Sequence, residues 1–217
     1  MSTQVVKRIV VLISGSGSNL QSIIDACESK LINAEIVGVI SNKVSAYGLE
    51  RAKSHHISIE AIDHTKFNSR DSFDAELMSV IDGWNADFVI LAGFMRILTP
   101  KFTEHYIGRL VNIHPSLLPK YPGLNTHQRA IEAKDTHAGA TIHFVTAELD
   151  GGPVILQAKV PIEKKETSDS LARKVLREEH VIYPQAIQWL CNGRLILTGN
   201  VAILDGKPLT ERGANWV

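Results

Sequence analysis

The 217-residue sequence contains only two cysteines, Cys27 and Cys191, and no C-x-x-C pair. So few and so widely separated thiols exclude a disulfide framework and a cysteine zinc site, and they are typical of a reducing compartment. No apolar run approaches the length of a membrane span, and "IVVLIS", which follows Lys7 and Arg8, is too short for the core of a signal peptide. We therefore expect a soluble, cytoplasmic protein with no membrane partner.

An excess of charge of either sign is also missing. The 23 Lys and Arg residues are balanced by 23 Asp and Glu residues. Without a basic surplus, nothing in the composition draws the whole chain to nucleic acid or to an anionic surface. We expect small-molecule substrates and no nucleic acid, and the sequence leaves open a monomer or a homodimer.

Apolar segments alternate with amphipathic ones over the first hundred residues. "RIVVLI", "AEIVGVI", "ISIEAI" and "DFVILAG" are predicted to be strands, with helices between them. Such repeated βα units build a parallel sheet with helices on both faces. The first helix carries apolar side chains on one face of a 3.6-residue period. They are Leu20, Ile23, Ile24, Cys27 and Leu31.

The pattern changes after about residue 109. A strand "RLVNI" precedes a proline-rich loop, a short helix near 126–133, and the apolar runs "ATIHFVT" and "PVILQAKVPI". The Asp-Gly-Gly turn between these runs predicts antiparallel pairing. A long helix over 168–190, interrupted or kinked by Pro184, and a last small β element follow. We expect one α/β domain with a Rossmann-like mixed sheet, parallel in the N-terminal half and partly antiparallel in the C-terminal half.

The stretch "SGSGSNLQ", residues 14–21, lies between the first predicted strand and the first helix. Gly15 and Gly17 let the backbone approach a ligand, and Ser18 with Gln21 has the spacing of a capping box. A helix start of this kind suits a phosphate, although any tightly packed α/β unit also needs a glycine-rich turn there. A leucine stands where the third glycine of the dinucleotide fingerprint belongs, and no Gly-Lys-Ser/Thr follows. A monophosphate therefore fits better than NAD or ATP.

The stretch "VNIHPSLLPKYPGL", residues 111–124, turns polar just as a strand leaves the core. The Asn112 side chain can donate to a negative oxygen, which suits the oxyanion of an acyl-transfer intermediate. His114 lies on the same side of the strand, and Pro115 restricts its backbone to extended conformations. Alone, the pair also fits a strand end with a capping Asn and an exposed His. Asp150 would orient the imidazole and favour its protonated form, although Asp-Gly is common in turns and spacing cannot show that the two loops meet.

The other polar candidates are expected to be structural. His55 and His56 are adjacent and lack the spacing of a metal pair. His143 alternates with apolar neighbours in a strand, so we expect it to be packed or paired there. Glu178 and Glu179 would ordinarily lie on the solvated face of a helix. The sequence therefore predicts no metal site.

Nearly the whole chain resembles the phosphoribosylglycinamide formyltransferase family, folate-dependent enzymes of purine synthesis. The resemblance runs through "VVLISGSGSNLQ", "SNK", "LAGFMRIL", "NIHPSLLPKYPGL" and "HFVTAELDGGPVILQAKVPI". It implies direct transfer of a formyl group from 10-formyltetrahydrofolate, as a co-substrate and without a metal, to the amine of glycinamide ribonucleotide. The catalytic trio that it implies is Asn112, His114 and Asp150. Two departures are small: Ser16 stands where bacterial relatives carry Asn, and Asn125 where they often carry His.

The resemblance also implies two sets of binding residues. The phosphate of the ribonucleotide would rest on the glycine-rich loop, so residues 1–108 form a nucleotide-phosphate half and residues 109–217 a folate and catalytic half of one formyltransferase domain. The ribonucleotide set is Gly17, Ser18, Asn19, Leu176, Arg177, Glu178 and Glu179. The folate set is Arg70, Met95, Arg96, Ile97, Leu98, Asn112, Thr146, Ala147, Glu148, Leu149 and Asp150.

Other functions share parts of this pattern. Methionyl-tRNA formyltransferase and formyltetrahydrofolate hydrolase carry the same trio, but the first adds a C-terminal tRNA-binding domain and the second an N-terminal regulatory one. We expect neither extra domain within 217 residues. A non-catalytic nucleotide-binding module of Rossmann type would leave the trio unexplained. Binding of the ribonucleotide without binding of folate would be its signature.

Overall fold

The structure is a computed structural model that describes residues 5–214. These residues form two compact units, which divide between Val111 and Asn112. The division lies close to the boundary expected between the two halves of the sequence. That the whole chain is one formyltransferase domain stays a prediction.

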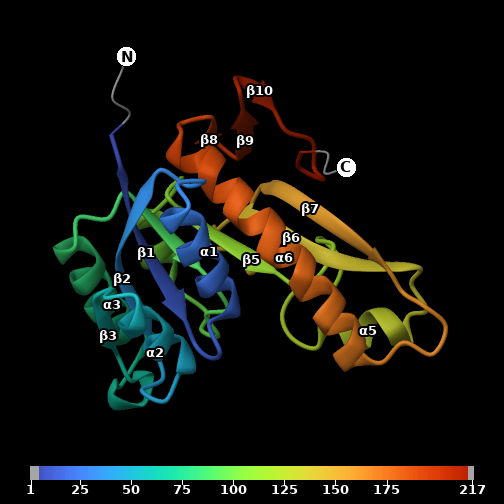
Figure 1. Cartoon of the computed structure of the whole chain (residues 1–217), viewed down its shortest axis with the longest axis horizontal. Coiled ribbons are helices and arrows are strands. Elements are labelled where there is room, and N and C mark those ends of the chain that lie inside the picture. Colours follow the sequence, from blue (N-terminus) through green and yellow to red (C-terminus); the bar gives the residue numbers. More distant parts are fainter. Residues whose placement is uncertain (1–4, 215–217) are drawn as a thin grey trace. The chain divides into compact units, whose positions relative to one another are not determined.

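The first unit is built on parallel strands in the order β3-β2-β1-β4. Figure 1 labels β1, β2 and β3. The strand bounds are β1 (Lys7–Ile13), β2 (Ala34–Ser41), β3 (Ile59–Ala61) and β4 (Phe88–Leu91). The pairs β1 with β2, β1 with β4, and β2 with β3 are all parallel. The last five residues of β1 are fully buried, because a central parallel strand is covered on both faces and needs no polar alternation. The parallel sheet expected from the sequence is confirmed.

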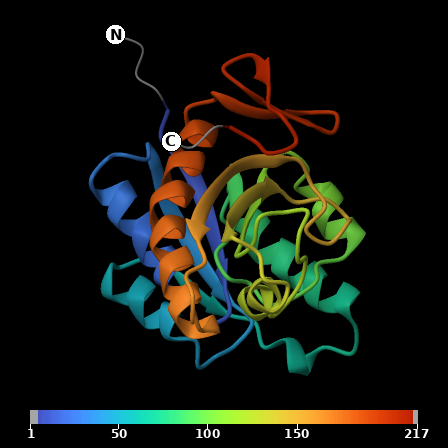
Figure 2. The ribbon, with the colours of Figure 1, turned by 90° about the vertical axis from the view of Figure 1, so that its right-hand side faces the viewer.

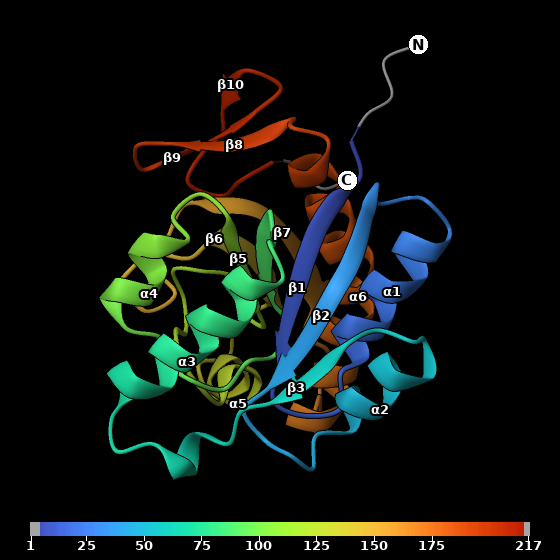
Figure 3. The ribbon, with the colours of Figure 1, turned by 90° about the vertical axis from the view of Figure 1, so that its left-hand side faces the viewer.

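Helices cover both faces of these strands. Figure 3 shows α1 (Ser18–Glu28) and α2 (Tyr47–Ser54) on one side, with α3 (Arg70–Gly83) and α4 (Pro100–His105) on the other. A short 3-10 turn, η1 (His64–Lys66), precedes α3. The buried Asp74 carboxylate of α3 accepts the N–H of Thr99 at 2.6 Å, at the start of α4. Burial raises the pKa of Asp74 above its usual range.

The second unit combines an antiparallel pair with a long helix. Strand β5 (Leu110–His114) carries the chain into this unit, where the strand order is β5-β6-β7. Strands β6 (His137–Phe144) and β7 (Val154–Pro161) pair in antiparallel fashion, as the Asp-Gly-Gly turn predicts. Helix α6 (Ser168–Cys191) packs along β6 and β7 (Figure 2), and α5 (Thr126–Glu132) is short.

Helix α6 differs from the expectation at Pro184. The helix continues through this residue, so an interruption there, one of the two expected outcomes, does not occur. Pro184 removes one backbone donor. Buried side chains on either side of it, among them Ile182 and Ile187, hold both halves of the helix against the core. Packing therefore outweighs the local preference of proline.

A small sheet ends the described part of the second unit. It comprises β8 (Leu195–Thr198), β9 (Val201–Leu204) and β10 (Lys207–Pro208), paired in antiparallel fashion. Parallel strands in one unit and antiparallel strands in the other confirm the mixed α/β class expected from the sequence. No helix within residues 5–214 is both long enough and apolar enough to cross a membrane.

The close approach of Gly38 to the Trp84 ring allows a test of the packing in the first unit. A Cβ at Gly38, in β2, would come within 2.1 Å of the Trp84 ring. We expect Gly38→Ala to lower the free energy of unfolding by about 1–3 kcal/mol, measured by urea denaturation. Gly83→Ala is the matched control, because its Cβ would meet nothing within 4 Å. Equal effects of the two substitutions would contradict this account.

Candidate active site

His114 and Asp150 meet in the second unit. His114 is the last residue of β5 and is buried, and Asp150 lies in the turn between β6 and β7. Asp150 Oδ2 is 3.5 Å from His114 Nδ1 and accepts the N–H of Gly123 at 2.9 Å. The structure thus brings together two loops that sequence spacing could not connect. The catalytic roles of the two residues stay predictions.

Asn112 completes the group from β5, two residues before His114. Its Nδ2 lies 3.1 Å from Nε2 of His143, which belongs to β6. The same nitrogen of His143 is 3.9 Å from Asp150 Oδ1. His143 is buried, as expected, but its contact with Asn112 is one that the sequence analysis missed. The only signal in the sequence was its polar side chain inside an apolar strand.

Both nitrogens of the His114 ring have a neighbour. Nε2 lies 2.9 Å from the carbonyl oxygen of Tyr121, so this nitrogen carries a proton and donates it. Nδ1 faces the Asp150 carboxylate at 3.5 Å. These two contacts fix the orientation of the imidazole. A second proton, on Nδ1, would point at a negative charge.

The loop after β5 is held by the buried hydroxyl of Thr141, a residue of β6. This hydroxyl donates to the carbonyl of Ser116 at 2.6 Å and accepts the N–H of Leu118 at 3.0 Å. The side-chain amide of Gln157, on β7, donates to the same oxygen at 2.9 Å. Pro115 restricts the start of this loop. Thr141 adds three polar contacts that no pattern in the sequence indicated.

Two other histidines of this unit favour the neutral form. Burial lowers the pKa of His143 below its ordinary value, while the Phe144 carbonyl and the Asp150 charge oppose this effect. Burial also lowers the pKa of His127, a residue of α5, and the His114 charge adds to this. Nε2 of His127 is buried and has no hydrogen-bond partner within the described residues. No pattern in the sequence singled out His127.

In the first unit, the helix after the glycine-rich loop begins differently from the prediction. Gly17 is the N-cap of α1, with a φ of 70°, and no side chain caps the helix. Ser18 is already the first helical residue. The capping box predicted from Ser18 and Gln21 is therefore wrong, because the left-handed conformation that only glycine adopts easily ends the loop one residue earlier.

Helix α2 holds the glycine-rich loop in place. The Gly48 N–H donates to the carbonyl of Gly15 at 3.0 Å, and the Arg51 side chain donates to the carbonyl of Ser16 at 2.9 Å. A Cβ at Gly17 would come within 2.6 Å of Gly48 Cα. Two glycines are thus needed for the backbones to approach. At Gly15 a Cβ would meet nothing within 4 Å, so this position stays open.

The remaining residues predicted to bind the ribonucleotide lie in both units. Asn19, in the first unit, is buried. Leu176, Arg177, Glu178 and Glu179 lie on α6 in the second unit. Glu179 is only 7% exposed, so the expectation of a solvated face is wrong for it. It lies one helical turn from Val175 and from Ile182, on the face of α6 that packs inward.

The residues predicted to bind folate are also divided between the units. In the first unit, Arg70, Met95 and Ile97 are exposed and Leu98 is buried. The Nε of Arg96 is buried and has no hydrogen-bond partner within the described residues. In the second unit, residues 146–150 lie in the connection between β6 and β7. Ala147, Glu148 and Leu149 are exposed and Thr146 is half-buried, whereas only 9% of the Asp150 side chain is exposed.

Comparison with known proteins identifies the family. Residues 7–187 match the family model described as formyl transferase. The chain belongs to the formyl transferase family. The phosphoribosylglycinamide formyltransferase of Escherichia coli strain K12 is 54% identical over 205 residues, which cover 94% of this chain and 97% of that protein. That of Haemophilus influenzae is 50% identical over 207 residues, covering 95% and 98%.

A solved structure agrees with this formyl transferase fold. The phosphoribosylglycinamide formyltransferase of Coxiella burnetii matches with a TM-score of 0.91 and 48% identity, over 95% of this chain and 97% of that one. The family resemblance and the fold class predicted from the sequence are both confirmed.

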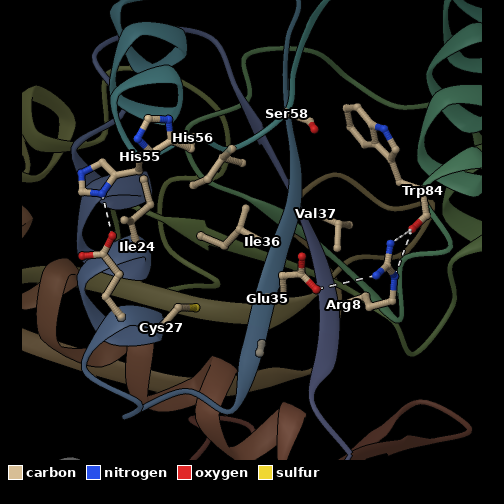
Figure 4. Close-up of a pocket in the computed structure, with 13 residues that line it drawn as sticks. Arg8, Ile24, Cys27, Glu35, Ile36, Val37, His55, His56, Ser58 and Trp84 are labelled. Atoms are coloured by element: carbon tan, nitrogen blue, oxygen red, sulfur yellow. Dashed lines mark hydrogen bonds and ion pairs between the residues drawn. The ribbon is translucent and has the colours of Figure 1, made fainter.

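A separate open cavity of about 580 Å³ lies in the first unit (Figure 4). It contains none of the predicted site residues of this formyl transferase. The pair formed by His55 and Glu28, 2.7 Å apart, lines this cavity together with Cys27, and Trp84 lies on its opposite side. Burial raises the pKa of the Cys27 thiol to about 12, so it stays protonated. No group of His, Cys, Asp and Glu in the described part of the chain is arranged to hold a metal ion.

The contacts of Thr141 with the loop after β5 can be tested by substitution. Thr141→Val keeps the shape but leaves the buried Leu118 N–H without its acceptor. We expect it to lower the free energy of unfolding by about 1–3 kcal/mol in thermal or urea denaturation. Thr141→Ser keeps the hydroxyl and is the control. A valine variant as stable as the wild type would show that the hydroxyl contacts of Thr141 do not stabilise the loop.

Proposed function

We propose that the chain transfers the formyl group of 10-formyltetrahydrofolate to the amine of glycinamide ribonucleotide, a step of de novo purine biosynthesis. Two relatives that are 54% and 50% identical are phosphoribosylglycinamide formyltransferases. The observation that carries the proposal is the grouping of an amide donor, an imidazole and a carboxylate in the second unit. Asn112, His114 and Asp150 supply them.

Asn112 supplies the donor for the reaction intermediate. When the amine attacks the formyl carbon, the formyl oxygen becomes an oxyanion. The Nδ2 of Asn112 carries two protons, and contact with His143 uses one of them. The other is available to the oxyanion. A donor that is already in place stabilises such a charge more effectively than water, which must first reorient.

We assign to His114 and Asp150 the proton transfer that accompanies formyl transfer. The attacking amine loses one proton in the reaction, and the nitrogen of tetrahydrofolate that releases the formyl group gains one. The Asp150 carboxylate stabilises a protonated His114 ring while negative charge develops on the intermediate. Because only 7% of the His114 side chain and 9% of the Asp150 side chain are exposed, water screens this interaction little.

We assign the ribonucleotide phosphate to Gly17, Ser18 and Asn19. These residues begin α1, where the first backbone N–H groups have no partner within the helix. Anchoring of the loop by α2 keeps this helix start rigid. From the second unit, Leu176, Arg177, Glu178 and Glu179 are assigned to the remainder of the ribonucleotide. Glu179 is the buried acidic member of this set.

We assign the folate to residues of each unit. In the first, the apolar residues Met95 and Ile97 are 58% and 56% exposed, which suits a flat aromatic ring. The exposed guanidinium of Arg70 suits a carboxylate. Arg96 and Leu98 complete this part of the set. From the second unit the set contains Asn112, Thr146, Ala147, Glu148, Leu149 and Asp150.

The cellular setting belongs to the same proposal. We propose that residues 1–217 form one formyltransferase domain that acts in the cytoplasm on small molecules, as a monomer or a homodimer. No metal takes part in the proposed reaction.

A spectrophotometric assay with glycinamide ribonucleotide and a formyl-folate analogue tests the function. We expect formyl transfer by the wild type, and a loss on the order of 10²–10³ in kcat for Asn112→Ala, because one oxyanion donor is removed. Asp150→Asn is expected to lose at least about tenfold. Asp205→Asn is the control, because Asp205 has the same left-handed φ of 51° but lies in the β9–β10 turn.

Three outcomes would contradict the proposal. If the wild-type protein is folded and inactive, and binds the ribonucleotide but not folate, the chain is a nucleotide-binding module. Release of formate without the ribonucleotide indicates a formyl-folate hydrolase. Full activity of both trio variants would remove Asn112 and Asp150 from the reaction.

A further inference from the structure

His143 and Asn112 form a hydrogen bond whose direction can be deduced. Nδ1 of His143 lies 2.9 Å from the carbonyl oxygen of Phe144. A carbonyl only accepts, so Nδ1 must carry the proton. In a neutral imidazole, Nε2 then has a lone pair and is an acceptor. Its neighbour at 3.1 Å is Nδ2 of Asn112, which donates.

The surroundings of His143 keep the ring in this form. Its side chain is only 2% exposed, and burial lowers its pKa. The charged groups that face it are Asp150, whose Oδ1 is 3.9 Å from Nε2, and His114. Asp150 favours a protonated ring and a protonated His114 disfavours it. The Phe144 carbonyl satisfies Nδ1 whether the ring is neutral or charged.

The protonation state of His143 therefore decides whether the NH2 group or the oxygen of the Asn112 amide faces Nε2 of His143. A side-chain amide has nearly the same shape when it is rotated by half a turn, so packing alone does not select between the two orientations. The lone pair of His143 Nε2 selects the one in which NH2 faces it. The protein thus uses a neutral histidine to orient an amide.

We propose that His143 is a positioning residue for formyl transfer, which holds the Asn112 amide with its NH2 group available to the oxyanion. This inference rests on the function proposed above and adds to it a residue outside the trio. His143 itself contacts no reacting atom. It acts through the orientation of Asn112, so its loss should reduce kcat and leave substrate binding nearly unchanged.

Two substitutions separate positioning from a structural role. An asparagine at 143 places its NH2 near the position of Nδ1, so His143→Asn keeps the bond to the Phe144 carbonyl and loses the acceptor for Asn112. A glutamine reaches the position of Nε2, so His143→Gln keeps an acceptor for Asn112 and loses the backbone bond. Each variant therefore keeps one of the two contacts of His143, with the Phe144 carbonyl or with the Asn112 amide, and loses the other.

We expect His143→Asn to lose about 10- to 100-fold in kcat, with each KM changed less than about threefold. His143→Gln should retain at least about fivefold more kcat than His143→Asn, even if it melts at a lower temperature. If His143 only supports the fold, His143→Asn is the more active of the two, and this order overturns the proposal.

NMR of the wild type provides a readout that needs neither activity nor a variant. With ¹⁵N-labelled histidine, we expect a protonated Nδ1 and an unprotonated Nε2 for His143 at neutral pH, with a coupling to Nδ2 of Asn112. A protonated Nε2 at neutral pH overturns the proposal.

The failure of this inference differs from the failure of the proposed function. A wild type that transfers no formyl group contradicts the function itself. An active wild type in which His143→Asn retains full kcat contradicts only the role of His143.

Discussion

The contact of the Asp150 carboxylate with two parts of the loop after β5 organises the second unit. The carboxylate accepts the backbone N–H of Gly123 and faces the imidazole of His114. A buried carboxylate must be compensated, and these two groups compensate it. The same contact ties the β6–β7 turn to the loop after β5. The position of His114 therefore depends on a residue far from it in the sequence.

Polar groups of β6 complete this arrangement from the other side. Thr141 satisfies backbone groups of the loop, and His143 satisfies one N–H of Asn112. Each is a buried polar side chain on a strand whose other residues are almost all buried and apolar. Burying a polar side chain costs free energy, and this cost is offset here because Thr141 and His143 each have hydrogen-bond partners. Rigid orientation of Asn112 and His114 is the result, and preorganised donors are what an oxyanion requires.

The histidines of this unit show how environment separates identical side chains. His143 and His127 are shifted toward the neutral form by burial. His114 has the Asp150 carboxylate beside Nδ1 and the Tyr121 carbonyl beside Nε2. His143 has the Phe144 carbonyl beside Nδ1 and the Asn112 amide beside Nε2. The two rings therefore have different hydrogen-bond partners, although both lie near the Asp150 carboxylate.

The sequence by itself determined the family and the parallel and antiparallel parts of the sheet, and it predicted the trio of Asn112, His114 and Asp150. Apolar runs, a turn signal and local motifs carry that information, and each depends on residues close in the chain. Only the tertiary structure decided that Asp150 lies beside His114, that His143 contacts Asn112, and that Glu179 is buried. These contacts depend on strand order, on the β6–β7 pairing and on which face of α6 packs inward. Such properties arise from the packing of distant segments, and no local pattern encodes them.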